Sequence, residues 1–175
     1  MTILSVQASE NQLQDDRQVQ SSLESSDDAT LFSGVRAVIV EDEGVIQLQL
    51  KKSLHKLGMK VVGTAINGEE GVGICLNERP EIIFMDINMP GQINGLEAAR
   101  RILAEYRACI IILTAYTEYE EEARKLGACG YVVKPVDAMM LRYQLRKAFV
   151  KFQARQSMSA QSLESTRLSG NQSDP

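Results

Sequence analysis

Five short apolar runs recur along the chain and determine the fold that the sequence predicts. They are AVIV at 37–40, VVGTA at 61–65, EIIFM at 81–85, CIIIL at 109–113 and GYVV at 130–133. Each run is nearly continuous and rich in β-branched residues. This pattern is typical of strands that are buried on both faces of a parallel sheet.

Segments with helical periodicity follow the strands. In the first of them, Ile46, Leu50, Leu54 and Leu57 lie on one face, and Gly58 ends the helix. Later apolar stripes are Leu96, Ala99 and Leu103; Ala123 and Leu126, ended by Gly127; and Leu141, Leu145, Ala148 and Phe152. The alternation predicts a doubly wound α/β sandwich, with a five-stranded parallel sheet and helices on both of its faces.

Polar segments flank this alternation. Residues 1–33 are rich in Ser, Gln, Asp and Glu, and residues 153–175 have a similar character. Neither segment has apolar residues at a spacing that would give a buried face, so we predict that both are disordered. The predicted folded domain is residues 34–152.

The net charge of −4 is distributed unevenly. Residues 1–33 contain six acids and one Arg, whereas residues 34–152 contain sixteen Lys or Arg and fifteen Asp or Glu. A domain this close to neutral has no strong attraction for nucleic acid or for anionic lipid. We therefore expect neither nucleic acid nor a membrane as a partner.

The cellular location is predicted from the N-terminal residues, the apolar stretches and the spacing of the cysteines. The N-terminal residues have neither the basic start nor the apolar run of a signal peptide. No stretch approaches the roughly 18 apolar residues of a membrane span. Cys75, Cys109 and Cys129 follow no metal or redox spacing, which favours buried thiols in a reducing compartment. The predicted location is cytoplasmic.

Polar side chains stand where the predicted strands end. Glu41 and Asp42 follow the first strand, Asp86 the third, Thr114 the fourth and Lys134 the fifth. In a doubly wound sheet the functional crevice lies at the carboxyl ends of the strands. Each feature alone is a common loop or cap residue, but together they predict a polar site at one edge of the sheet.

These residue types suit phosphoryl transfer to a carboxylate. Clustered acids repel one another unless a cation intervenes, and oxygen ligands suit Mg²⁺. The ion and Lys134 would offset the charge of Asp86 and of an incoming phosphoryl group, while Thr114 would donate a hydrogen bond to it. The predicted product is an aspartyl phosphate, formed mainly through positioning and charge neutralisation.

The motifs VIVEDE, FMDINMP with the following Gly95-Leu96-Glu97, ILTA and GYVVKP together resemble the receiver domain of bacterial two-component response regulators. The resemblance covers about residues 35–152. It implies a flavodoxin-like strand order, 2-1-3-4-5, in a stand-alone, chemotaxis-type receiver. Such a protein is a signalling switch rather than an enzyme, although it assists its own phosphorylation and dephosphorylation. The implied partners are a histidine kinase or phosphotransfer protein, a downstream protein and, as a further option, a second copy of the chain.

The resemblance also assigns the metal site. Asp86 matches the phosphoacceptor. Asp42, Asp86 and the backbone carbonyl of Asn88 match the Mg²⁺ ligands, and Glu41 would act largely through water. One departure from the family pattern is Glu41 itself, because Asp is commoner there. Another is the loop MPGQING, which is one residue longer than usual.

Three further positions match parts of the switch. Thr114 and Lys134 match the switch hydroxyl and the phosphate-binding lysine of the family. Tyr131 matches the aromatic residue whose rotamer reports the phosphorylated state. Ala115 is small, as access to the acceptor requires.

Three other functions fit parts of the sequence. A phosphatase of the haloacid-dehalogenase type needs a second Asp where this chain has Asn88. A flavin-binding electron carrier needs a phosphate-binding loop after the first strand, where Glu41, Asp42 and Glu43 would repel phosphate. The third alternative is a receiver that is never phosphorylated and serves as a docking module. A phosphorylation assay distinguishes it from a phosphorylated switch.

Overall fold

The structure is a computed structural model of the 175-residue chain, and it describes residues 27–169. One parallel sheet has the strand order β2-β1-β3-β4-β5, which is the order that the resemblance to receiver domains implies. The strands are β1 (Arg36–Val40), β2 (Lys60–Ala65), β3 (Ile82–Asp86), β4 (Cys109–Thr114) and β5 (Gly130–Val133). The fold class and the strand order are confirmed, and the strand ends differ from the predicted runs by at most one residue.

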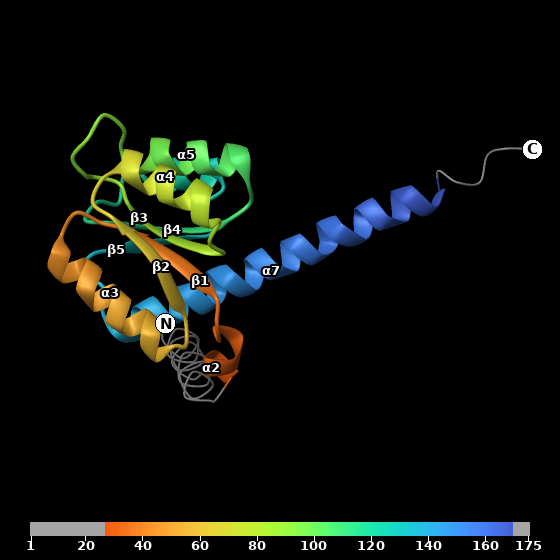
Figure 1. Cartoon of the computed structure of the whole chain (residues 1–175), viewed down its shortest axis with the longest axis horizontal. Helices are drawn as coiled ribbons and strands as arrows, with labels where there is room; N and C mark the ends of the chain where they lie inside the picture. The colour runs from red at the N-terminus through yellow and green to blue at the C-terminus, as the bar shows by residue number, and fades with distance from the viewer. Residues whose placement is uncertain (1–26, 170–175) are drawn as a thin grey trace, which may run out of the picture.

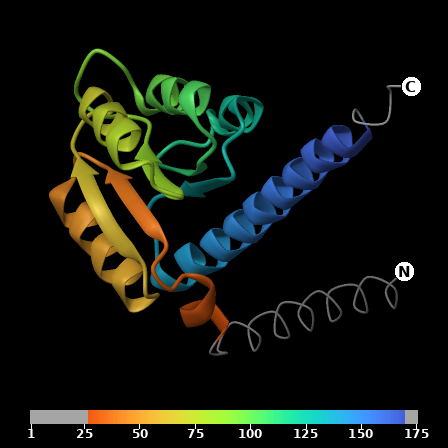
Figure 2. The same cartoon turned by 45° about the vertical axis from the view of Figure 1, so that its right-hand side comes forward.

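Helices cover both faces of the sheet (Figures 1 and 2). They are α2 (Asp27–Leu31), α3 (Gly44–Lys56), α4 (Gly68–Glu78), α5 (Gly95–Glu105), α6 (Glu120–Leu126) and α7 (Ala138–Ser169). Helices α3 and α7 pack on one face, and α4, α5 and α6 pack on the other. Within residues 27–169, no helix has the combined length and apolar character that a membrane crossing requires.

The core consists of two layers separated by the sheet. Ile39 and Phe84 point to the layer beneath α3 and α7, whereas Val40 and Met85 point to the layer beneath α4 and α5. All four side chains are fully buried. Burial on both faces explains why the strands read as continuous apolar runs. Each large side chain removed from water in this way contributes about 1.5–3 kcal/mol.

The segment before β1 is part of the folded domain, and here the structure differs from the predicted disorder of residues 1–33. Helix α2 places the carboxylate of Asp28, which is 1% exposed, against the guanidinium groups of Arg142 and Arg146 on α7. Phe32 is fully buried, and its ring lies 5.6 Å from the ring of Phe149. A single helical turn is too short to show a period, which is why the sequence pattern does not reveal it.

Residues 153–169, which the sequence predicts to be disordered, belong to helix α7 in the structure. The helix continues past Phe152 to Ser169 and extends beyond the sheet (Figures 1 and 2). Residues 138–169 contain no Gly or Pro that would end the helix. The part beyond the sheet has no regular apolar stripe, and such a stripe is the pattern by which a helix is predicted from a sequence. Residues 1–26 and 170–175 lie outside the described residues.

We expect Phe32→Ala to lower the free energy of unfolding by about 3–5 kcal/mol, because it removes a fully buried ring from the core. Urea denaturation of the full chain measures this change. Leu48→Ala on α3 is the control, since Leu48 is 53% exposed and its loss should cost less than about 0.5 kcal/mol. Equal, small effects of both variants would contradict the docking of α2 against α7.

Candidate functional site

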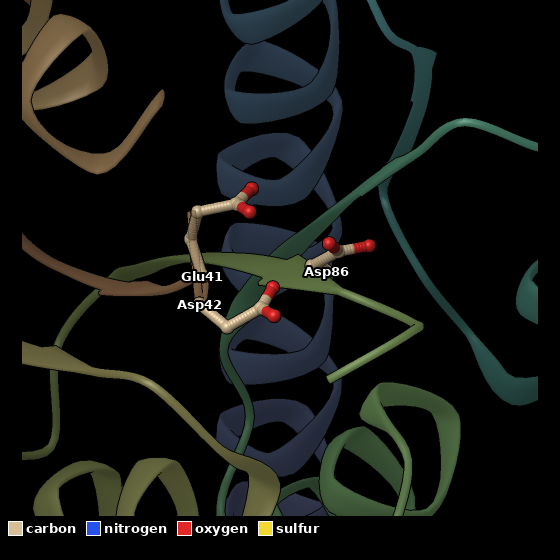
Figure 3. Close-up of side chains that lie close together, drawn as sticks. All are labelled: Glu41, Asp42 and Asp86. Carbon is tan, nitrogen blue, oxygen red and sulfur yellow. The ribbon is translucent and has the colours of Figure 1, made fainter. Parts of the chain in front are cut away.

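The carboxyl ends of β1 and β3 lie side by side because these two strands pair, with Val40 opposite Met85. The next residues are Glu41 and Asp42 after β1 and Asp86 at the end of β3. Ligand oxygens of the three carboxylates lie within 4.8 Å of one another (Figure 3). The neighbouring strands β2 and β4 lie on opposite sides of this pair, so the cluster occupies the point at which the order of the strands reverses.

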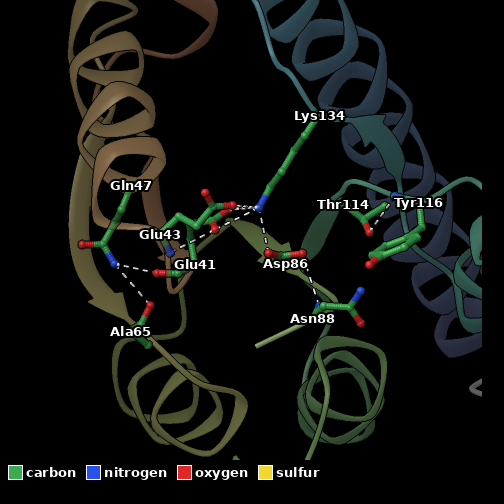
Figure 4. A network of polar contacts seen from close by, with 9 residues as sticks. All are labelled: Glu41, Glu43, Gln47, Ala65, Asp86, Asn88, Thr114, Tyr116 and Lys134. Atoms are coloured by element: carbon green, nitrogen blue, oxygen red, sulfur yellow. Dashed lines mark hydrogen bonds and ion pairs between the residues drawn. The ribbon is translucent and has the colours of Figure 1, made fainter. Parts of the chain in front are cut away.

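Lys134 reaches into this cluster from the end of β5 (Figure 4). Its Nζ atom donates a hydrogen bond of 2.7 Å to Oδ2 of Asp86 and one of 2.9 Å to Oε1 of Glu41. The exposed carboxylate of Glu43 lies farther away, at 3.5 Å. The ammonium thus bridges two carboxylates. Burial and mutual repulsion would otherwise disfavour the charged form of these groups.

Burial and charge act in opposite directions on the two most enclosed groups. Burial raises the pKa of Glu41 above its ordinary value, and the hydrogen bond from Lys134 only partly offsets this effect. Burial alone would lower the pKa of Lys134, yet the hydrogen bonds to Asp86 and Glu41 outweigh it and raise that pKa. Lys134 is therefore held as a cation at neutral pH, beside the nucleophilic candidate Asp86.

The oxygen atoms of the cluster fit a hard divalent cation. Oε2 of Glu41 is buried and accepts no hydrogen bond, although Nζ of Lys134 lies 2.8 Å away as an ion-pair contact. Asp42 is exposed, so a hydrated ion could reach the cluster from solvent. The donor set contains only oxygen, and Mg²⁺ prefers one or two carboxylates together with water molecules and phosphate oxygens.

Asn88 lies two residues beyond Asp86 in the loop after β3. Its backbone N–H donates a hydrogen bond of 3.3 Å to Oδ1 of Asp86. The two carboxylate oxygens of Asp86 thus have different partners, the Asn88 amide and the Lys134 ammonium. This fixes the orientation of the carboxylate at the mouth of the acidic cluster.

Thr114 and Tyr131 are linked through the backbone of Tyr116. The hydroxyl of Thr114, at the end of β4, is fully buried and accepts a hydrogen bond of 3.3 Å from the Tyr116 amide (Figure 4). The hydroxyl of Tyr131, on β5, donates a hydrogen bond of 2.8 Å to the Tyr116 carbonyl. Ala115 lies between these partners and is exposed. The described structure therefore joins both predicted switch residues to one short loop.

Two further residues near the site have roles that the sequence analysis does not assign. Gln47 on α3 donates from Nε2 to the backbone carbonyls of Glu41 and Ala65, which ties the helix to the ends of β1 and β2. Gly95 begins α5 so close to β3 that a Cβ there would lie 1.8 Å from the Asp86 carbonyl oxygen. The sequence shows Gly95 only as part of a motif, and Gln47 not at all.

The loop after Pro90 is anchored on helix α4. The carboxylate of Glu69, in the first turn of α4, accepts hydrogen bonds from the backbone amides of Gln92 and Ile93. Gly91 has φ +128°, a conformation that other residues rarely adopt. The loop is thus held in a fixed bend.

A doubly wound sheet with three carboxylates, a partly buried lysine and a buried hydroxyl at its carboxyl edge defines a receiver-type signalling domain. The family profile of the response regulator receiver domain matches residues 37–146. The chain therefore belongs to the response regulator receiver domain family of two-component signalling.

The relatives agree with this assignment. The chain is 37% identical over 102 residues to the transcriptional regulatory protein PdtaR of Mycobacterium tuberculosis. This match covers 57% of this chain and 49% of PdtaR. It is 34% identical over 114 residues to the transcriptional regulatory protein BtsR of Escherichia coli. That match covers 65% of this chain and 47% of BtsR. The chain thus spans about half the length of these curated relatives.

A solved structure shows the same fold. It is the signal receiver domain of a modulated diguanylate cyclase from Desulfovibrio desulfuricans G20, and it superimposes with a TM-score of 0.63 at 33% identity. The match covers 69% of this chain and 97% of that one. The part that matches is the receiver domain, so the likeness concerns the fold of that domain.

Proposed function

We propose that this chain is a cytoplasmic phosphorylation switch in which Asp86 accepts a phosphoryl group from a histidine kinase or a phosphotransfer protein. The observation that carries this proposal is the position of Lys134. Its ammonium contacts Asp86 and Glu41 inside an otherwise acidic cluster, where it can offset added negative charge. The signal would leave through protein contacts, with a downstream protein or with a second copy of the chain.

The chemistry assigned to the side chains follows from their contacts. An oxygen of Asp86 attacks the phosphorus atom of the donor, and the bond from phosphorus to the donor atom breaks, leaving an aspartyl phosphate. Lys134 already contacts Asp86 and would hold a phosphoryl oxygen as charge builds up. Thr114 would donate its hydroxyl hydrogen to another phosphoryl oxygen. The chain thus acts as an acceptor rather than as an enzyme with a separate substrate.

Magnesium fits as the resident cofactor. Asp42, Asp86 and the backbone carbonyl of Asn88 would bind it directly, and Glu41 would contact it through water. The ion would supply charge neutralisation for the carboxylate and the phosphoryl oxygens. The position of Glu41 supports an indirect role, because its carboxylate is already occupied by Lys134.

The switch would act through the loop that joins Thr114 to Tyr131. A phosphoryl group would draw the Thr114 hydroxyl away from the Tyr116 amide, and Tyr131 would turn from its bond to the Tyr116 carbonyl. Phosphorylation can shift this equilibrium only by the difference in its contacts between the two states. Output is expected on the surface of β5 and the start of α7, where Met139 and Met140 are exposed.

Labelling with acetyl phosphate tests the proposal on the full chain. Label should appear only with Mg²⁺ present, should survive acid, should be lost in base and should map to Asp86. Removing the ion with a chelator should reduce the rate to background. A chain that takes up no label with Mg²⁺, from either acetyl phosphate or a phosphorylated phosphotransfer protein, would support the docking module instead.

We expect Thr114→Ala to be phosphorylated but to lose most of the conformational response, because it lacks the hydroxyl that contacts the phosphoryl group. Amide exchange over residues 114–145, with and without beryllofluoride, measures that response. Thr114→Ser keeps the hydroxyl and should therefore retain the conformational response. A full response from Thr114→Ala, with the site occupied, would remove Thr114 from the switch.

A further inference from the structure

A second cluster of reactive groups lies at the opposite, amino-terminal edge of the sheet. Cys109 is the first residue of β4, and Cys129 directly precedes β5. The backbone amide of Cys129 donates a hydrogen bond of 2.8 Å to the carbonyl of Ile110, which holds the two cysteines side by side. Cys109 is fully buried, whereas Cys129 is partly exposed, in contrast to the buried thiols that the sequence predicts.

Two cavities meet at Cys129. The larger, of about 530 Å³, lies between the end of α5 and α7, and the smaller, of about 210 Å³, lies between α6 and α7. Four cationic side chains from three helices or their ends line them: Arg107, Arg124, Lys151 and Arg155. Within the described part of the chain, no Asp or Glu lines either cavity. Arg124 is paired with Glu121 on α6, so Lys151 and Arg155 are the cations whose charge acts on the partly exposed thiol.

The surroundings of Cys129 favour its thiolate. The hydrogen bond from the Cys109 thiol, together with the charges of Arg155 and Lys151, lowers the pKa of Cys129 to about 7 against the opposing effect of burial. The pKa of Cys109 rises correspondingly because its thiol is the donor. Burial raises the pKa of Cys75 to about 12. The thiolate is the nucleophilic form of cysteine, so the three cysteines differ in expected reactivity.

We propose that Cys129 is a thiol-modification site that forms a mixed disulfide with the disulfide of a small acidic thiol. The Cys129 thiolate attacks one sulfur of that disulfide, its sulfur–sulfur bond breaks, and the second half leaves as a thiolate that takes up a proton. The small disulfide is the oxidant: one half is bound to Cys129 and the other is released reduced. Arg155 and Lys151 select the anionic compound over neutral or cationic ones.

Exchange rates measured on the native full chain test the proposal. The probes are glutathione disulfide, which carries acidic groups, and cystamine, a cationic disulfide, each normalised to its rate with free cysteine. We expect Cys129 to favour glutathione disulfide by about tenfold, with early adducts mapped to Cys129 by peptide mass spectrometry. Cys129→Ser should abolish the early adduct, and Cys75→Ser should leave it unchanged.

Two further measurements separate charge selection from simple exposure. The double variant Lys151→Gln/Arg155→Gln should reduce the preference at least about threefold, whereas the surface control Lys51→Gln should not. Raising the salt concentration from about 0.02 M to about 0.5 M should slow the reaction of the unaltered chain with glutathione disulfide and speed its reaction with cystamine. Equal normalised rates for the two probes in low salt, or early adducts at Cys75 or Cys109, would overturn the proposal.

Discussion

The Asp86→Asn variant is expected to take up no phosphoryl group from acetyl phosphate, with labelling at least about a hundredfold below that of the unaltered chain. The amide has nearly the shape of the carboxylate but lacks its charge and nucleophilicity. Asp86 also ends β3 between the Lys134 ammonium and the Asn88 amide, a position that no other carboxylate of the described chain shares.

A matched surface variant shows whether the loss is specific. Asp137 caps the start of α7 by accepting a hydrogen bond from the Met140 amide. Asn is an equally good residue at such a position, so Asp137→Asn should fold normally and retain full labelling. Base-labile label at one equivalent in Asp86→Asn would place the acceptor elsewhere.

The second large effect concerns the metal. We expect Asp42→Asn to raise the Mg²⁺ concentration for half-saturation by about 10–100-fold, and Glu41→Gln to raise it much less. Asp42 is exposed at the mouth of the cluster, where a direct ligand is needed, whereas Glu41 is fully buried and contacts Lys134. Titration calorimetry measures both affinities.

The titrations need a suitable signal and a control variant. The chain contains no Trp, so a direct heat signal avoids any need for an added fluorophore. Glu43→Gln serves as the control, because Glu43 is exposed and lies 3.5 Å from Lys134 without belonging to the three-carboxylate cluster. Equal losses from the variants at 41 and 42 would mean that the two acids have exchanged roles.

Much of this fold is predictable from the sequence because the sheet is buried on both faces. Continuous apolar runs mark the strands, and the polar residues that end them must meet at one edge. That reasoning places Asp86 beside Lys134, although 48 residues separate them, and the contact of 2.7 Å agrees with it. The roles of these residues in phosphorylation stay predictions until they are measured.

Other parts of the structure depend on contacts that leave no periodic trace. Glu69 holds the loop through backbone amides of Gln92 and Ile93, and any residue other than Pro could offer the same amide there. The smaller cavity at Cys129 combines side chains from two helices, such as Arg124 and Lys151, whose spacing in the chain gives no hint of a shared cavity.

The contact between α2 and α7 also has a consequence for the order in which the chain folds during synthesis. Asp28 emerges from the ribosome 114 residues before Arg142, and Phe32 precedes Phe149 by a similar length. At roughly 5–20 residues per second, this separation means about 6–23 s without their partners. The first described helix can therefore join the domain only after α7 has been made, when the sheet already has all its strands.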